Sequence, residues 1–172
     1  SQAPRIIHSP DADDALSLIA SRNFDLVITM TNVGTMDAYA FARMVKVHQE
    51  DVPVVMLSQN TRELATLRTG DGIDRIFVWG GDSRILLSIC KLIEDERNVE
   101  NDVRDGDVQV ILLVEDSRRF YSAYLPLLYT QLVRQTTKLM GEGGNLHEKL
   151  LRLRARAKIL LASDMASAKE II

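Results

Sequence analysis

One mainly apolar run, Phe24-Asp25-Leu26-Val27-Ile28-Thr29-Met30, constrains the fold more strongly than any other stretch of the sequence. The run follows the polar end of a predicted helix and stops at a polar, glycine-containing loop at residues 31–37. A short run of this kind predicts a strand that is buried on both faces, as in a parallel sheet. The carboxyl end of such a strand is where an open α/β sheet keeps its active site. The residue at that end is Met30, whose thioether is neither a nucleophile nor a ligand for hard cations. The position is therefore typical of a site, but its side chain is chemically inert.

Similar runs recur along the chain and alternate with helical patterns. Strands are predicted at residues 5–8, 25–30, 52–58, 73–79, 108–114 and 158–162. Helices are predicted at residues 11–22, 37–48, 60–67, 84–97, 117–140 and 146–155, with a last helix that starts after residue 164. This order predicts an α/β fold with a doubly wound parallel sheet. The last helix is interrupted at Ile172, so we expect the natural chain to continue.

The sequence also predicts a division into domains. Residues 98–107 contain four acidic residues and a glycine between two predicted elements. We interpret them as a domain linker or a wide surface turn. The first domain would then cover residues 1–97, and the second would cover residues 108–172.

Composition limits the classes of partner. The net charge of −3 gives no overall attraction to nucleic acid or to an anionic membrane. No signal-like segment and no apolar segment of about 18 residues is present in the sequence. The single cysteine, Cys90, falls in the apolar pattern of a helix, where we expect a buried core thiol. These features predict a cytoplasmic protein whose partners are other proteins or other domains of the same polypeptide.

Three further features are interpreted as structural. His8, His48 and His147 are isolated, with no spacing that would form a metal site or a catalytic pair. The basic side chains of residues 149–158 alternate with leucines, which is typical of a solvated helix face. Residues 141–144 predict a flexible joint, because neither a preceding strand nor a following Lys-Ser/Thr pair indicates a phosphate loop.

The passage at residues 24–30, with Met36-Asp37 and the strands at residues 52–58 and 73–79, resembles a response-regulator receiver domain. The resemblance covers about residues 5–97 and begins at what would be the second strand. It implies a flavodoxin-like fold, with the phosphate-accepting aspartate of the family at Met30, its hydroxyl residue at Ser58 and its lysine at Trp79. Phosphoryl transfer to a receiver needs a carboxylate nucleophile, a Mg²⁺ site of acidic oxygens and a cation. The resemblance therefore implies a pseudo-receiver that is not phosphorylated at Met30.

The passage at residues 110–117, Val-Ile-Leu-Leu-Val-Glu-Asp-Ser, is similar to the first strand and acidic pair of a second receiver. Glu115 and Asp116 match the Mg²⁺-binding acids of that family, and the acceptor aspartate would lie beyond Ile172. The pair is thus an incomplete metal site, so Mg²⁺ is expected only in an intact second domain. The alternative is that Asp116 and Ser117 start the next helix, where negative charge is favourable.

Three passages together, at residues 72–79, 98–102 and 120–129, resemble a region of certain bacterial proteins. That region is the N-terminal tandem receiver-like segment that precedes a phosphoenolpyruvate synthase or pyruvate phosphate dikinase type module. The resemblance implies a regulatory segment of a larger polypeptide, with a receiver-like sheet and an extra helical segment.

The implied sheet has a geometric consequence. A receiver sheet that begins at its second strand leaves a slot between residues 5–8 and residues 25–30, with unpaired edges and apolar surface. The strand at residues 108–114 has a first-strand pattern. We expect it to fill the slot, either within one chain or in a homodimer formed by strand exchange.

Three functions follow from these features. The leading one is a non-enzymatic regulatory module that acts through protein interaction. The alternative is a phosphorelay response regulator whose second receiver is phosphorylated on an aspartate beyond this sequence. The third, a small-molecule enzyme that uses Ser58, is weaker because no residue at a strand end forms a nucleophile and base pair.

Overall fold

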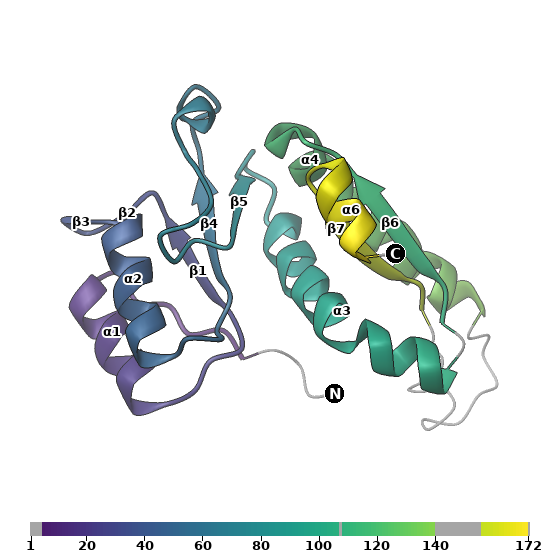
Figure 1. The fold of residues 1–172 in the computed structure, drawn as a ribbon, viewed down its shortest axis with the longest axis horizontal. Helices are drawn as coiled ribbons and strands as arrows, with labels where there is room; N and C mark the ends of the chain where they lie inside the picture. The colour runs from purple at the N-terminus through teal and green to yellow at the C-terminus, as the bar shows by residue number, and fades with distance from the viewer. Residues whose placement is uncertain (1–4, 107, 140–155, 172) are drawn as a thin grey trace. The chain divides into compact units, whose positions relative to one another are not determined.

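The computed structural model describes residues 5–106, 108–139 and 156–171. The chain is a mixed α/β protein with parallel sheets (Figure 1). It divides into two compact units, Ser1–Trp79 and Gly80–Ile172, and each unit has its own sheet. Within the described ranges, no helix combines the length and the apolar character needed to cross a membrane.

The first unit is built on a three-stranded parallel sheet in the order β1-β4-β5. The register places Met30 opposite Leu57 and Ser58 opposite Val78. Its elements are α1 (Ala12–Ser21), β1 (Val27–Met30), β2 (Asn32–Val33), β3 (Met36–Asp37), α2 (Ala38–His48), β4 (Val54–Ser58), η1 (Glu63–Ala65) and β5 (Arg75–Val78).

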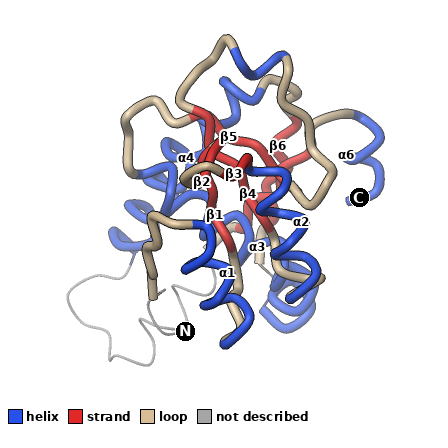
Figure 2. The backbone as a smooth tube through the Cα atoms, turned by 90° about the vertical axis from the view of Figure 1, so that its left-hand side faces the viewer, coloured by secondary structure: helices blue, strands red, loops and turns tan. Residues whose placement is uncertain are grey.

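Helices α1 and α2 cover one face of this sheet (Figure 2). Each helix begins at an aspartate whose side chain accepts backbone N–H groups of the first turn, Asp11 for α1 and Asp37 for α2. Their buried apolar stripes pack against alternate residues of the strands. The shared core contains Leu16, Ile19, Phe41, Val45, Val54, Met56 and Ile76.

Three predictions for this unit need correction. Residues 5–8 form no strand and are exposed, because no neighbouring strand pairs with them in the described part of the chain. The loop at residues 31–37 contains the short antiparallel pair β2-β3, whose turn includes Gly34 at a positive φ of 62°. The helix expected at residues 60–67 is reduced to the single 3₁₀ turn of η1.

The second unit contains the two-stranded parallel sheet β6-β7. Helix α3 packs against α4 and β7, and α6 contacts both strands. The elements are α3 (Arg84–Gly106), β6 (Val110–Val114), α4 (Arg118–Leu139), β7 (Lys158–Ala162) and α6 (Met165–Ile171). Asp164 caps α6 by accepting the N–H of Ser167 at 2.7 Å.

The predicted linker is wrong, because α3 continues through residues 98–106 as one helix. The boundary between the two compact units falls before α3, at Trp79. Strand β6 pairs with β7 and is not part of the sheet that contains β1. This pairing uses one edge of β6, so the expectation that this strand fills the slot beside β1, within one chain or in a homodimer, stays a prediction. Strand β6 was also predicted to be buried, whereas its two end residues are exposed.

Several predictions fall on residues outside the described ranges. They are the joint at residues 141–144, the helix at residues 146–155, His147, and the basic residues before Arg156.

Candidate functional site

Met30, Ser58 and Trp79, the three residues at receiver site positions, lie at the carboxyl ends of the strands of the first sheet. Met30 ends β1, Ser58 ends the neighbouring β4, and Trp79 directly follows β5. The backbone N–H of Trp79 donates to the carbonyl of Ser58 at 2.8 Å. The carboxyl ends of parallel strands lie at the same end of a sheet. Met30, Ser58 and Trp79 therefore lie at the same end of the first sheet.

None of the three offers chemistry for group transfer. Met30 is half-buried, and its carbonyl accepts a hydrogen bond from the hydroxyl of Thr29 at 3.0 Å. The Ser58 hydroxyl is fully buried, donates to the carbonyl of Asn60 at 3.1 Å and accepts its N–H at 3.2 Å. Such a local turn fixes the hydroxyl at the strand end. Trp79 is half-buried and carries no positive charge.

Strand β1 is the outer strand of its sheet, and its side away from β4 is an open edge without a partner strand among the described residues. The N–H of Val27 donates to the carbonyl of Pro53, so Val27 and Thr29 direct their backbone groups toward β4. Alternate residues point the other way, so the N–H and carbonyl of Ile28 face away from β4. In the described part of the chain, β4 is the only strand that pairs with β1.

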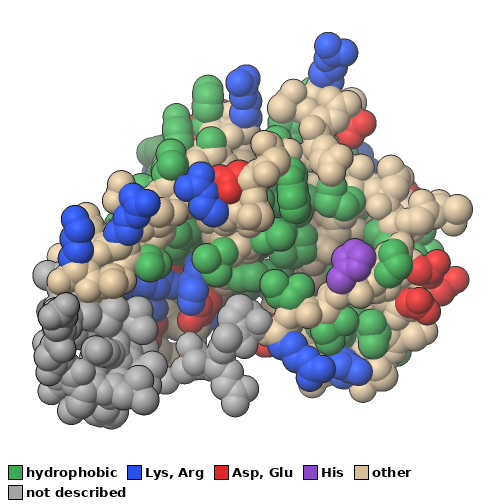
Figure 3. Space-filling view, turned by 180° about the vertical axis from the view of Figure 1, so that it is seen from behind, with side chains coloured by type: hydrophobic (Ala, Val, Ile, Leu, Met, Phe, Trp, Pro, Cys, Tyr) green, Lys and Arg blue, Asp and Glu red, His purple; other side chains and the backbone are tan. Residues whose placement is uncertain are grey.

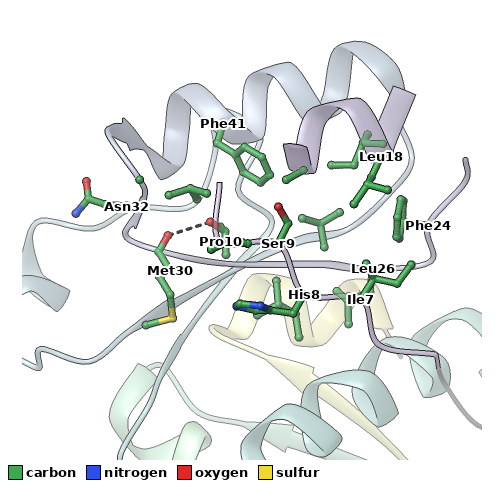
Figure 4. Close-up of a pocket in the computed structure, with 17 residues that line it drawn as sticks. Ile7, His8, Ser9, Pro10, Leu18, Phe24, Leu26, Met30, Asn32 and Phe41 are labelled. Carbon is green, nitrogen blue, oxygen red and sulfur yellow. Dashed lines mark hydrogen bonds between the residues drawn. The ribbon is translucent and has the colours of Figure 1, made fainter. Parts of the chain in front are cut away.

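A pocket of about 370 Å³ lies beside β1 (Figure 4). Residues 7–10 form one wall, α1 contributes Leu18, β1 contributes Ile28, and Leu26 lies directly before β1. The lining combines apolar side chains with polar groups, among them His8, Thr29 and Asn32. In Figure 4 the side chains of His8 and Met30 lie on the side of β1 away from Phe41. The pocket occupies the place where the sequence predicted an open slot.

The α1 wall of this pocket is held by one side chain from the end of α2. The Gln49 amide donates to the carbonyls of Ile19 at 2.6 Å and Arg22 at 2.8 Å, which are at the end of α1. Its oxygen accepts the N–H of Phe24 at 2.9 Å. One glutamine thus satisfies backbone groups that the helix end leaves open, and it fixes α1 beside β1.

The acidic pair of the second unit serves a local role. One carboxylate oxygen of Glu115 accepts the N–H of Ser117 at 3.0 Å, immediately before α4. Asp116 is exposed. No group of three histidine, cysteine or acidic side chains that could hold a metal occurs among the described residues. The arrangement favours the alternative in which this segment starts the helix.

A buried charge cluster that the sequence patterns did not predict joins α3 to β7. Asp95 is fully buried and accepts hydrogen bonds from both terminal nitrogens of Arg156, at 3.0 and 2.6 Å. Its carboxylate also accepts the hydroxyl of Tyr129 at 3.1 Å and the N–H of Ile159 at 3.0 Å. The Arg156 guanidinium lies 5.6 Å from the centre of the Tyr129 ring. Asp95 lies three residues after Leu92, which is buried in α3, and this helical spacing between an apolar residue and a carboxylate was the available signal.

The interpretation of the basic segment at residues 149–158 as a solvated helix face needs correction for its described residues. Arg156 and Lys158 are buried rather than solvated. Lys158 lies 2.6 Å from Asp102, one heptad after Asp95 on α3. Both cations are neutralised by carboxylates from α3, which explains how they are tolerated in the interior.

The environment of the cluster shifts two pKa values. Burial and the adjacent charge of Asp95 raise the pKa of Tyr129, because both disfavour the phenolate. Burial opposes the charged form of Arg156, but the hydrogen bond and charge of Asp95 outweigh it and raise the pKa of Arg156. Cys90 is half-buried, and burial raises the pKa of its thiol. It is therefore a weak nucleophile.

The sequence matches no protein-family model and no curated protein.

Proposed function

We propose that the protein is a non-catalytic regulatory module of the pseudo-receiver type, which acts by binding a protein segment at the open edge of β1. The observation that carries the proposal is Met30 at the carboxyl end of β1, directly beside the pocket. The strand order also supports the proposal. The neighbours β1, β4 and β5 follow one another as the third, fourth and fifth strands do in a doubly wound receiver sheet. The parallel pair β6-β7 agrees with the first and second strands of another such sheet.

The chemistry at the strand ends supports binding rather than phosphoryl transfer. A receiver reaction needs a carboxylate to attack phosphorus and a nearby cation to balance the charge. Here the corresponding positions hold a thioether at Met30 and an indole at Trp79. The hydroxyl of Ser58 already uses its donor and acceptor within a local turn.

The pocket and the open edge suit an extended apolar segment. The backbone N–H and carbonyl of Ile28 can pair with a strand added at this edge, which is a common mode of peptide recognition. The apolar lining from Leu18 and Leu26 would receive its side chains. Such a segment belongs to a protein partner or to another domain of the same polypeptide. By the stated resemblance, that domain is a phosphoenolpyruvate synthase-like module.

Phosphorylation provides the first test. The chain is incubated with acetyl phosphate and Mg²⁺, reduced with borohydride to trap any aspartyl phosphate, and mapped by peptide mass spectrometry. We expect no modified aspartate in the wild-type chain. We also expect none in Met30→Asp, because Trp79 supplies no cation. Labelling of any aspartate in the wild-type chain would overturn the proposal. Labelling only in a longer polypeptide, beyond Ile172, would support the phosphorelay alternative instead.

The pocket can be tested with a dye. Anilinonaphthalene sulfonate gains fluorescence in apolar sites, so we expect an increase with the wild-type chain. Leu18→Glu places a charge in the pocket lining and should abolish the increase. Leu87→Glu adds the same charge at an exposed position of α3 and should not. Equal dye fluorescence in both variants, with unchanged circular dichroism, would show that the pocket does not bind apolar groups.

A further inference from the structure

The connection from β4 to β5 is the longest stretch of the first unit without an α-helix or a strand (Figure 1). We call its residues 60–72 the strap. The strap contains the 3₁₀ turn η1 and, near its end, a tight turn in which Gly70 and Ile73 exchange backbone hydrogen bonds at 2.8 and 2.9 Å. Most of its side chains are exposed, so the strap lies on the surface of the unit.

Two side chains of the strap are exceptions to this exposure. Leu64 and Leu67 are half-buried and pack against the apolar core that α1 and α2 share with the first sheet. They are three residues apart, which is the spacing that places side chains on one side of a 3₁₀ turn. The strap therefore covers part of this core with one apolar side.

Both ends of the strap are held in place. At its start, the buried Ser58 hydroxyl donates to the carbonyl of Asn60 at 3.1 Å and accepts the N–H of Asn60 at 3.2 Å. At its end, Gly72 packs directly against α2, since a Cβ added to Gly72 would lie 2.8 Å from the backbone of Ala42. These two contacts fix where the strap begins and where it ends.

The middle of the strap is held by the hydroxyl of Tyr39, the second residue of α2. This hydroxyl donates to the carbonyl of Arg68 at 3.0 Å and accepts the N–H of Arg68 at 2.9 Å. One side chain thus satisfies both backbone groups of one strap residue. Both hydrogen bonds lie in exposed surroundings, where water can replace them at a small net cost in free energy. This contact is therefore weaker than the contacts at the two ends.

We propose that the strap is a lid whose residues 61–69 leave α2 while the sheet stays folded, and that the Tyr39 hydroxyl is the latch that keeps this lid closed. Opening removes Leu64 and Leu67 from the core, so it uncovers an apolar site that the closed form hides. A ligand for that site binds only the open fraction of the molecules, so the strength of the latch sets the apparent affinity. The inference does not depend on the role proposed for the β1 pocket.

Hydrogen exchange tests the latch. The N–H groups of Thr66, Leu67 and Arg68 are hydrogen-bonded in the closed strap, so their exchange reports on its opening. Tyr39→Phe removes the hydroxyl and keeps the ring, so these three amides should exchange about tenfold faster. The amides of β4 and β5 should keep their exchange rates. Tyr124→Phe removes an exposed hydroxyl from the second unit and is the matched control, which should change none of these rates.

Cleavage by trypsin gives a second readout that is confined to the strap. A dye would not be confined to it, because hydrophobic side chains are also exposed elsewhere on the surface (Figure 3). Trypsin cleaves after Arg68, whose carbonyl the latch holds. This cleavage should be roughly tenfold faster in Tyr39→Phe, whereas cleavage after Arg43, an exposed residue within α2, should not change.

Two results would overturn the proposal. The first is that exchange and cleavage in the strap are unchanged in Tyr39→Phe. The second is that the strap amides of the wild-type chain exchange no faster than those of β4 and β5, because the strap would then open only with the whole unit. If Tyr39→Phe fails to fold, this wild-type comparison decides alone.

Discussion

Replacing Asp95 by asparagine should strongly destabilise the second unit. The two side chains have nearly the same shape, so the change removes the charge with little change in packing. Arg156, whose side chain is 7% exposed, would then be left buried beside a neutral group. Breaking a buried ion pair by removing one partner typically costs about 3–5 kcal/mol. The asparagine amide would also place a donor against the guanidinium, where the carboxylate accepts two hydrogen bonds.

Urea unfolding measures this effect. With a slope of about 1.5 kcal/mol per M for one unit, a loss of about 4 kcal/mol lowers the midpoint by roughly 2.5 M. Circular dichroism follows the whole chain, whereas fluorescence of Trp79, the single tryptophan, follows the first unit. The change should therefore be larger by circular dichroism. Glu94→Gln is the control, since its pair with Lys91 is partly exposed and should contribute at most about 0.5 kcal/mol.

Replacing both charged partners should restore stability. Replacing both partners, as Asp95→Leu with Arg156→Met, removes the charge without leaving its partner unpaired. Apolar replacements of buried ion pairs are often neutral or stabilising, so the double variant should recover much of the loss. If Asp95→Asn changes the free energy of unfolding by less than about 1 kcal/mol, Arg156 is not dependent on this carboxylate. The account of the cluster would then be wrong.

Four other variants test the fold. Gly72→Ala places a Cβ 2.8 Å from the backbone of Ala42 at a positive φ of 89°. We expect it to lower the free energy of unfolding by about 2–4 kcal/mol. Gly34→Ala also has a positive φ but open space around the Cβ, so it should lower the free energy of unfolding by about 1 kcal/mol. Equal unfolding midpoints would contradict this. Gln49→Glu removes both amide donors to the end of α1 and should cost about 1–3 kcal/mol, visible as faster hydrogen exchange in α1. Since the pKa of Tyr129 is raised in the folded state, stability should be unaffected below about pH 10 and fall by about 1.4 kcal/mol per pH unit above it. Tyr129→Phe should make that alkaline decline shallower, and an unchanged slope would refute the assignment.

Local patterns were sufficient to predict most of the strands. The runs that became β1, β4 and β7 are short, apolar and bounded by polar residues, so period and length identified them. The grouping of Met30 and Ser58 followed because parallel strands end at a common edge. The strand predicted at residues 5–8 was wrong, because a short apolar pair forms a strand only where a neighbouring strand supplies hydrogen bonds.

The continuation of α3 through residues 98–106 could not be predicted from composition. The segment is polar and acidic, which locally resembles a linker. In the fold, Asp95 and Asp102 lie on one side of α3 and bind Arg156 and Lys158, about sixty residues further along the chain. A contact of that sequence separation leaves no local signal. The acidic residues that suggested a linker include one that holds the helix in place.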